Sequence, residues 1–408
     1  MSDATGQPSR FPNGPFLRYI VGEGVSMTGT WMQAMAQGWV MAGLTSSGQA
    51  MAWVHFAGGV PMIALSMLGG LCADRFDKRR ILQACQAVQI VLALWLGSLV
   101  GAGAVGIWHV VLAAGLLGVS AAFEMPAAAA IVPELAGPAH VARAIAIDRA
   151  VFHGTRLIGP ALAGYLVTHF GEASAFYLNA LTFVVLMAAL ATLPPRAQGG
   201  KEQELRRQAG MAEGVRHLRA DRPSLAMVLM LSANTLCVFP VLIVLLPLYG
   251  KHVLKVTPDG LGWLMFCSGI GSLLGSLLIM ALPAPRRGAV MCAALVVICG
   301  GLASLSFAAG FWWPAVTLLL LALGVSTLVG LANTIVQERS PEEIRGRVSA
   351  ISGLSFFGLI PFAAVAMGTV ADSVGIRETL LGAAAVYAVL GGLVLTWGRT
   401  GGPSGPGH

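Results

Sequence analysis

The sequence predicts an all-α protein whose helices span a membrane. Of its 408 residues, 56% are hydrophobic and only 11% are charged, and the mean hydropathy is +0.77. A soluble domain carries roughly 25% charged residues. The apolar residues also gather in long runs, and about 20 such residues are enough to cross a bilayer. Both observations indicate that most of the chain is surrounded by lipid.

Twelve apolar runs between turn signals are long enough to be spans. Glycine and proline inside them are compatible with membrane helices, because neighbouring helices satisfy the freed backbone groups. We expect the spans at 16–44, 49–71, 81–103, 108–132, 141–169, 173–193, 224–250, 259–282, 289–310, 313–337, 346–371 and 379–397.

A charged stretch, 194–223, divides these spans into two sets of six. We therefore predict two pseudo-symmetric six-helix bundles, 1–193 and 224–408, joined by a cytoplasmic linker. Apolar residues recur in the linker at helical spacing among arginines, which favours a helix on the inner membrane surface. A solvated linker with some helical content is the alternative. The apolar positions are Leu205, Ala209, Ala212, Val215 and Leu218.

An internal repeat supports this division. Sliding the chain by about 204 residues superimposes equivalent residues of the fourth and fifth spans on those of the tenth and eleventh. The pairs are Glu134 with Glu338, Arg143 with Arg347, Gly154 with Gly358, Gly164 with Gly368 and Gly171 with Gly375.

The positive charges predict the orientation. Of 25 Lys and Arg residues, the loops expected outside receive Lys251, Lys255 and Arg377, while Arg149 and Arg156 fall within a span. Positively charged short loops are retained inside. We therefore expect both termini to be cytoplasmic.

Several function classes have no support. The six cysteines show no metal or disulfide spacing, and G-x-x-x-x-G-K-[ST], H-E-x-x-H and G-x-S-x-G are absent from the sequence. We expect no metal, no cofactor and no enzymatic activity. The isoelectric point near 9.4 reflects the basic inner loops and not binding to nucleic acid.

Two motifs and three shorter segments carry a family resemblance. The loop 70–80 resembles a signature of the major facilitator superfamily, with Asp77 in place of the usual glycine, and the fifth span resembles its antiporter motif. The residues are Gly70, Asp74, Arg75, Lys78, Arg79 and Arg80 in the loop, Arg156, Gly159, Pro160 and Gly164 in the fifth span, and the segments 30–39, 123–126 and 342–348.

Together these segments are similar to the enterobactin-exporter-like branch, the transmembrane secretion effectors, which is related to macrolide efflux pumps. The resemblance implies a monomeric, proton-driven exporter of a small molecule in the bacterial inner membrane. A siderophore or a similar secreted metabolite is the expected substrate, and multidrug efflux is the alternative. An uptake carrier of the same fold and a receptor that moves nothing are further alternatives.

The loop between the second and third spans predicts a conformational latch. Asp74 stands at the inner end of its span, where a carboxylate can face the positive end of another helix. We expect Gly70, Asp74, Arg75 and Arg79 to stabilise the conformation closed to the cytoplasm. Alternatively, these charges only set the topology.

In the fifth span, Gly159, Pro160 and Gly164 lie about one turn apart. This spacing lets the helix bend and pack closely against a partner, which would hinder leakage. Ordinary small-residue packing is the other interpretation.

Ionisable residues inside spans are costly and usually face a cavity or a partner. Counting about 1.5 Å of rise per residue from the inner ends of the spans places three acids at a depth of about 12–14 Å: Glu23, Glu124 and Asp148. At this shared depth they could form one polar layer. We expect Arg149 and Arg156 to face these acids. Glu124 or Glu23, and then Asp148, are the candidate proton carriers, and a static salt-bridge cluster is the alternative.

Five neutral polar residues within spans are candidates for a substrate cavity. They are Gln33 and Gln37 in the first half, and Asn234, Asn333 and Gln337 in the second. A cavity that is charged on one wall and apolar on the other suits an amphipathic molecule.

Overall fold

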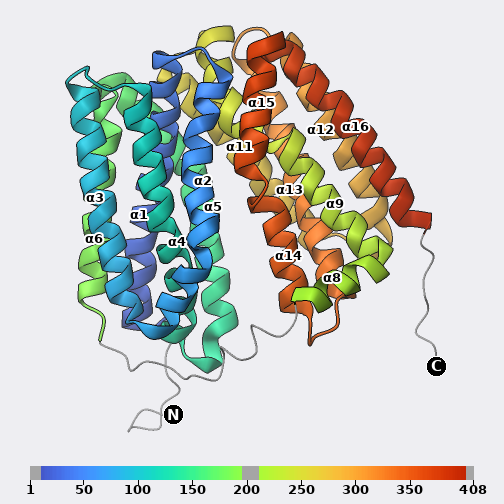
Figure 1. Ribbon diagram of the computed structural model, residues 1–408, viewed down its shortest axis with the longest axis horizontal. Coiled ribbons are helices and arrows are strands. Elements are labelled where there is room, and N and C mark those ends of the chain that lie inside the picture. The colour runs from blue at the N-terminus through green and yellow to red at the C-terminus, as the bar shows by residue number, and fades with distance from the viewer. Residues whose placement is uncertain (1–10, 195–210, 401–408) are drawn as a thin grey trace. The chain divides into compact units, whose positions relative to one another are not determined.

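A computed structural model of the chain describes residues 11–194 and 211–400. Within these two ranges the regular structure is helical and no strand occurs. The first six helices are α1 (Gly14–Leu44), α2 (Gly48–Arg75), α3 (Lys78–Gly101), α4 (Ile107–Ala136), α5 (Val141–Phe170) and α6 (Ala173–Ala191). Figure 1 shows them as long rods, several of which run alongside one another.

The later helices begin with the short α8 (Met211–Ala220). They continue with α9 (Arg222–Cys237), α10 (Leu246–Leu248), α11 (Pro258–Met280), α12 (Arg287–Phe307), α13 (Trp312–Arg339), α14 (Arg345–Phe357), α15 (Ile360–Val374) and α16 (Ile376–Thr400). Short 3-10 turns lie at Pro138–His140 and Ala284–Arg286, and π-helical turns at Val241–Leu245 and Tyr249–Val253.

The predicted all-α membrane fold is confirmed. Each of the twelve predicted spans is helical in the described part of the chain, and ten stretches are long and apolar enough to cross a membrane. The two predicted spans below this criterion are α1 and α5. They carry Glu23, Asp148, Arg149 and Arg156, and such ionisable side chains count against this criterion.

Two predicted spans are interrupted helices. The seventh starts as α9 and continues through π-helical turns on either side of α10. Pro240 and Pro247 lie in this region, and proline removes a backbone donor and disturbs the regular hydrogen-bond ladder. The eleventh is divided into α14 and α15, and Pro361 stands in the first turn of α15, where its missing donor is tolerated.

The chain forms two compact units. The first takes in described residues 11–44, 57–194 and 257–266, and the second takes in 45–56, 211–256 and 267–400. In the first unit, α1 packs against α5 and α6, and α3 packs against α4 and α6. Its core includes the fully buried Phe16, Tyr19, Leu186 and Leu190.

The second unit is built around α9, α12, α13 and α16. The predicted linker helix is present as α8, and residues 195–210 of that prediction lie outside the described ranges. Leu218 of α8 is 3% exposed and belongs to the unit's core. The apolar side of this helix therefore packs at least partly against protein.

The internal repeat appears in equivalent structural roles. Gly171 and Gly375 follow α5 and α15, and both have positive φ angles, +86° and +99°. Glu134 pairs with Lys78 in the first unit, and Glu338 pairs with Arg287 in the second. Each pair joins the end of one helix to the start of another, so the repeat is structural as well as sequential.

Candidate functional site: a polar cavity in the first unit

The first unit contains a cavity of about 290 Å³ whose walls come from α1, α3, α4 and α6. Both carboxylates predicted from α1 and α4 line it, together with both predicted glutamines of α1. The lining residues are Glu23, Ser26, Met27, Thr30, Gln33, Ala34, Gln37, Gln89, Leu117, Ala121, Glu124, Met125, Ala128, Asn179 and Phe183.

Two amide groups of α3 hold the carboxylate of Glu124. Gln86 Nε2 donates to Oε1 at 2.7 Å, and Gln89 Nε2 donates to Oε2 at 2.5 Å. Both glutamines are buried, with exposed fractions of 0% and 6%. Because they are three residues apart, they share one face of α3. The two oxygens of Glu124 are thus each bound by a separate donor.

The orientation of Gln86 is set by a second contact. Ser26 of α1 donates to Gln86 Oε1 at 3.5 Å, while the Nε2 of the same amide donates to Glu124. Gln89 Nε2 also lies 3.4 Å from Ser120 Oγ, where it can donate. The result is a hydrogen-bonded chain from α1 through α3 to α4.

A second polar network lines the cavity between α1 and α6. Asn179 Nδ2 donates to Gln33 Oε1 at 2.8 Å, and Thr182 Oγ1 donates to Asn179 Oδ1 at 2.9 Å. Gly29 makes room for it, because a Cβ at this position would overlap Asn179 and Thr182. The predicted cavity residue Gln33 is therefore held in place, while Gln37 lines the wall without a described hydrogen bond.

Glu23 faces the same cavity and interacts electrostatically with Glu124 and Asp148. The structure thus places two of the three acids expected in one layer, Glu23 and Glu124, in the wall of one cavity. Asp148 is half-buried, does not line the cavity and interacts electrostatically with the exposed Arg149.

Arg156 takes a different environment from the one expected. Its guanidinium lies over the ring of Trp31, 5.4 Å from the centroid, and Trp31 in turn meets Phe152 edge-on. A cation above an indole face is attracted by the ring quadrupole. Among the described residues, neither Arg156 nor Arg149 forms an ion pair with Glu23, Glu124 or Asp148.

The glycines of the predicted antiporter motif mark close helix contacts. A Cβ on Gly159 would lie 2.5 Å from Trp31 Cβ and 3.0 Å from the Thr28 carbonyl oxygen, so α5 approaches α1 closely here. Gly164 packs against the start of α11, where its Cβ would lie 2.8 Å from Asp259 Cα. Pro160 is buried between them.

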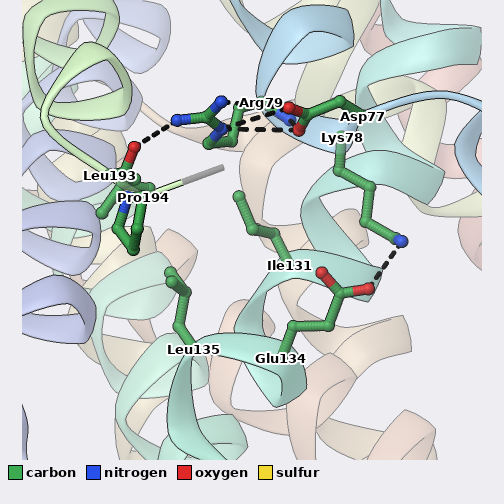
Figure 2. Close-up of a pocket in the computed structure, with 8 residues that line it drawn as sticks. All are labelled: Asp77, Lys78, Arg79, Ile131, Glu134, Leu135, Leu193 and Pro194. Carbon is green, nitrogen blue, oxygen red and sulfur yellow. Dashed lines mark hydrogen bonds and ion pairs between the residues drawn. The ribbon is translucent and has the colours of Figure 1, made fainter. Parts of the chain in front are cut away.

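Figure 2 shows Asp77, Lys78 and Arg79 at the start of α3. Asp77 caps this helix by accepting from the Arg79 backbone N–H at 3.0 Å, and the Arg79 guanidinium binds both Asp77 and the Leu193 carbonyl. Partial burial raises the pKa of Asp77, but the hydrogen bonds from Arg79 outweigh it and hold that pKa below its usual range. Asp77 therefore has a local role as a helix cap in the position where the signature usually has glycine.

The other residues of the predicted latch lie nearby. Asp74 and Arg75 form the last turn of α2, and Gly70 lies one turn before them. Gly69, the neighbour of Gly70, lies close to α4, because a Cβ there would overlap the Ala122 carbonyl oxygen. Lys78 pairs with Glu134 at 2.5 Å.

The predicted cavity residues of the second unit differ in exposure. Asn234 is fully buried, and its amide has no hydrogen-bond partner among the described residues. Asn333 is half-buried and donates to the Val329 carbonyl at 3.0 Å, while Gln337 is exposed.

Sequence reasoning missed Gln86, Gln89 and Asn179, which hold the polar groups of the cavity. A signal was present in each case. Gln83, Gln86 and Gln89 follow one another at intervals of three residues in a largely apolar span, and Asn179 interrupts the apolar sixth span. Polar side chains at such positions usually face the bundle interior.

A helical membrane fold with carboxylates in a polar cavity is typical of small-molecule transporters. The chain belongs to the transmembrane secretion effector family, whose sequence profile matches residues 11–398. This family and its fold are those of major facilitator transporters and not those of enzymes. The predicted family and the multi-pass membrane character are therefore confirmed.

Three known proteins show the extent of the similarity. The multidrug efflux pump Tap of Mycolicibacterium fortuitum is 25% identical over 93% of this chain and 94% of its own. The staphyloferrin A transporter of Staphylococcus aureus is 26% identical over 41% of this chain and 42% of its own. The crystal structure of a bacterial homologue of the lysosomal transporter Spinster has a TM-score of 0.72, with 14% identity over 95% and 98% of the two chains.

Proposed function

We propose that this protein is a proton-coupled exporter of small amphipathic molecules that acts by alternating access in the bacterial cytoplasmic membrane. The observation that carries this proposal is the cavity of the first unit, where Glu23 and Glu124 face each other within electrostatic range. Acids in a membrane helix that face a cavity are suited to proton relay and to charge recognition. The similarity to the Tap efflux pump over nearly the whole chain supports export of several compounds.

A siderophore or a related metabolite is the second candidate substrate. The similarity to the staphyloferrin A transporter favours it, although that match covers less than half of the chain. Comparing the metabolites excreted by the wild type and by a deletion strain under iron limitation distinguishes the two. Loss of an iron-chelating compound from the medium favours the siderophore, and unchanged chelator with greater drug accumulation favours multidrug efflux.

The same proposal includes the orientation of the protein in the membrane and the residues that stabilise its closed conformation. We place both termini in the cytoplasm because the basic loops would then lie inside, and we take the protein to act as a monomer. Asp74, Arg75 and Arg79, with Gly70, would stabilise the conformation closed to the cytoplasm. Unchanged transport and unchanged cytoplasmic cysteine accessibility in Asp74→Asn would contradict this role.

Reconstituted protein tests the coupling. Substrate movement in proteoliposomes should follow an imposed proton gradient, collapse with a protonophore and proceed without ATP. Glu23→Gln, Glu124→Gln and Asp148→Asn should include at least one variant that retains counterflow but loses gradient-driven flux. Glu172→Gln is the matched control, because Glu172 precedes α6 and does not line the cavity. Full gradient-driven flux in all three variants would refute the assignment to these acids.

A further inference from the structure

The two facing carboxylates of the cavity are held differently. Each oxygen of Glu124 accepts from a buried glutamine amide, with distances of 2.7 Å and 2.5 Å. No amide among the described residues donates to Glu23, which instead faces the Tyr19 hydroxyl and two other acids. Donors to a carboxylate stabilise its charged form, whereas neighbouring carboxylates disfavour it. The protein therefore stabilises a negative charge more on Glu124 than on Glu23.

The hydrogen bonds around Glu124 fit its ionised form. An ionised carboxylate is an acceptor on both oxygens, which matches two amide donors. A protonated Glu124 would add one O–H donor facing two amide donors, which is a poorer match than two acceptor oxygens facing two donors. If the Gln86 amide turned to accept this proton, its contact with Ser26 of α1 would be lost.

Building on the proposed proton-coupled export, we propose that Glu124 stays ionised and binds a cationic group of the substrate, whereas Glu23 takes up and releases the coupled proton. The inference thereby names the substrate class as amphipathic organic cations. It also makes Gln86 and Gln89 positioning residues that keep the two acids in separate roles.

No positively charged side chain lines the cavity beside Glu124. None of the described Lys, Arg or His side chains forms an ion pair with it, and apart from Glu23 the rest of the wall is uncharged. A poorly solvated carboxylate is costly without a partner, so a cation in the cavity would be strongly favoured. Met27, Leu117 and Phe183 supply apolar surface for the rest of such a molecule.

The surroundings of Glu23 suit a titrating group. It faces Tyr19 on its own helix, Glu124 from α4 and Asp148 from α5, and Asp148 interacts with Arg149. The third helix packed against α1 is α6, which carries no carboxylate, His, Lys or Arg. When Glu23 is protonated, one negative charge beside Glu124 is lost, so proton uptake should weaken the attraction for the cation.

The test compares two probes of similar shape and different charge. The cation 1-methyl-4-phenylpyridinium carries a charge that does not titrate, whereas 4-phenylpyridine N-oxide is neutral overall. Their binding to the full-length protein in nanodiscs is measured at alkaline and acidic pH. We expect the wild type to prefer the cation and to lose part of this preference at acidic pH.

The variants separate the two roles. Glu124→Gln should reduce cation binding about tenfold or more at every pH and leave the N-oxide unchanged. Glu23→Gln should keep the preference for the cation but remove its pH dependence. Gln89→Leu should make cation binding more sensitive to acid, because Glu124 loses a donor. Gln83→Leu is the matched control on the same helix, since Gln83 does not line the cavity.

Two results would overturn the inference: no preference for the cation in the wild type, or exchanged phenotypes for Glu23→Gln and Glu124→Gln. If Glu124→Gln does not purify as a folded protein, Gln89→Leu tests the inference in its place. Cation binding by Gln89→Leu that falls at acidic pH no more than that of Gln83→Leu would count against the inference. These binding results do not depend on flux. If cation flux in proteoliposomes does not depend on the proton gradient, the proposed proton coupling is refuted. The proposed cation site at Glu124 is not affected by that result.

Discussion

Gly368 of α15 lies directly against Gly48 at the start of α2, so closely that a Cβ on Gly48 would be 2.8 Å from the Gly368 carbonyl oxygen. A similar contact joins Gly164 of α5 to Gly262 of α11. Gly164 and Gly368 are equivalent in the internal repeat. In each half of the sequence, the equivalent glycine therefore leaves room for the first turns of another helix.

This contact predicts a site-specific effect of one methyl group. Gly368→Ala should destabilise the protein by about 1–3 kcal/mol, because the added Cβ would overlap the Gly48 backbone. Thermal unfolding in detergent measures the change. Gly382→Ala in α16 is the control, since its Cβ meets nothing within 4 Å. Equal melting temperatures for the two variants would contradict the prediction.

Asp372 caps the start of α2 from α15. Its carboxylate accepts from Ser47 Oγ at 2.6 Å and from the backbone N–H groups of Gly48 and Gln49 at 2.6 and 3.1 Å. Asp372→Asn replaces one acceptor by a donor and removes a charge that complements the helix dipole, which should cost about 1 kcal/mol. The neighbouring Ser373→Ala should leave the melting temperature nearly unchanged, and a matching loss there would argue against the cap.

The contact of α5 with α1 predicts a difference between two glycines of one helix. Gly159→Leu should abolish or uncouple export, because its side chain would overlap Trp31 and separate the helices. Gly154→Leu should be tolerated better, since a Cβ there meets nothing within 4 Å. Gradient-driven flux and proton leak in proteoliposomes measure both effects. A normally coupled Gly159→Leu variant would refute the role of this contact.

Asp221 predicts an acid-dependent contribution to stability. It caps α9 and accepts from Arg339 at 2.8 and 2.5 Å, and these hydrogen bonds lower the pKa of Asp221 to about 2. A lowered pKa in the folded state stabilises the protein above the unfolded value, near pH 4, and this contribution is lost as the pH falls toward 2.

Asp221→Asn should therefore lower the melting temperature at neutral pH, by the equivalent of about 1 kcal/mol. The difference from the wild type should shrink as the pH falls below about 4. Thermal unfolding across this pH range measures it. A gap of constant size down to acidic pH would show that the charge of Asp221 contributes nothing.

The sequence by itself determined the spans and the identity of the polar residues within them. Apolar runs of about 20 residues can satisfy their backbone groups in lipid only as helices, so all twelve positions were predictable. Glu23 and Glu124 stood out for a similar reason, because an ionisable group in a span needs a polar environment.

Only the tertiary structure decided the partners of these residues. Gln86 and Gln89 were visible as polar positions, but their contact with Glu124 depends on how α3 rotates against α4. Likewise, Arg156 was expected to face the acids and instead lies over Trp31. Helix rotation is set by the packing of many small side chains across the unit. No local pattern encodes it, and for that reason the acids could be located from the sequence while their separate environments could not.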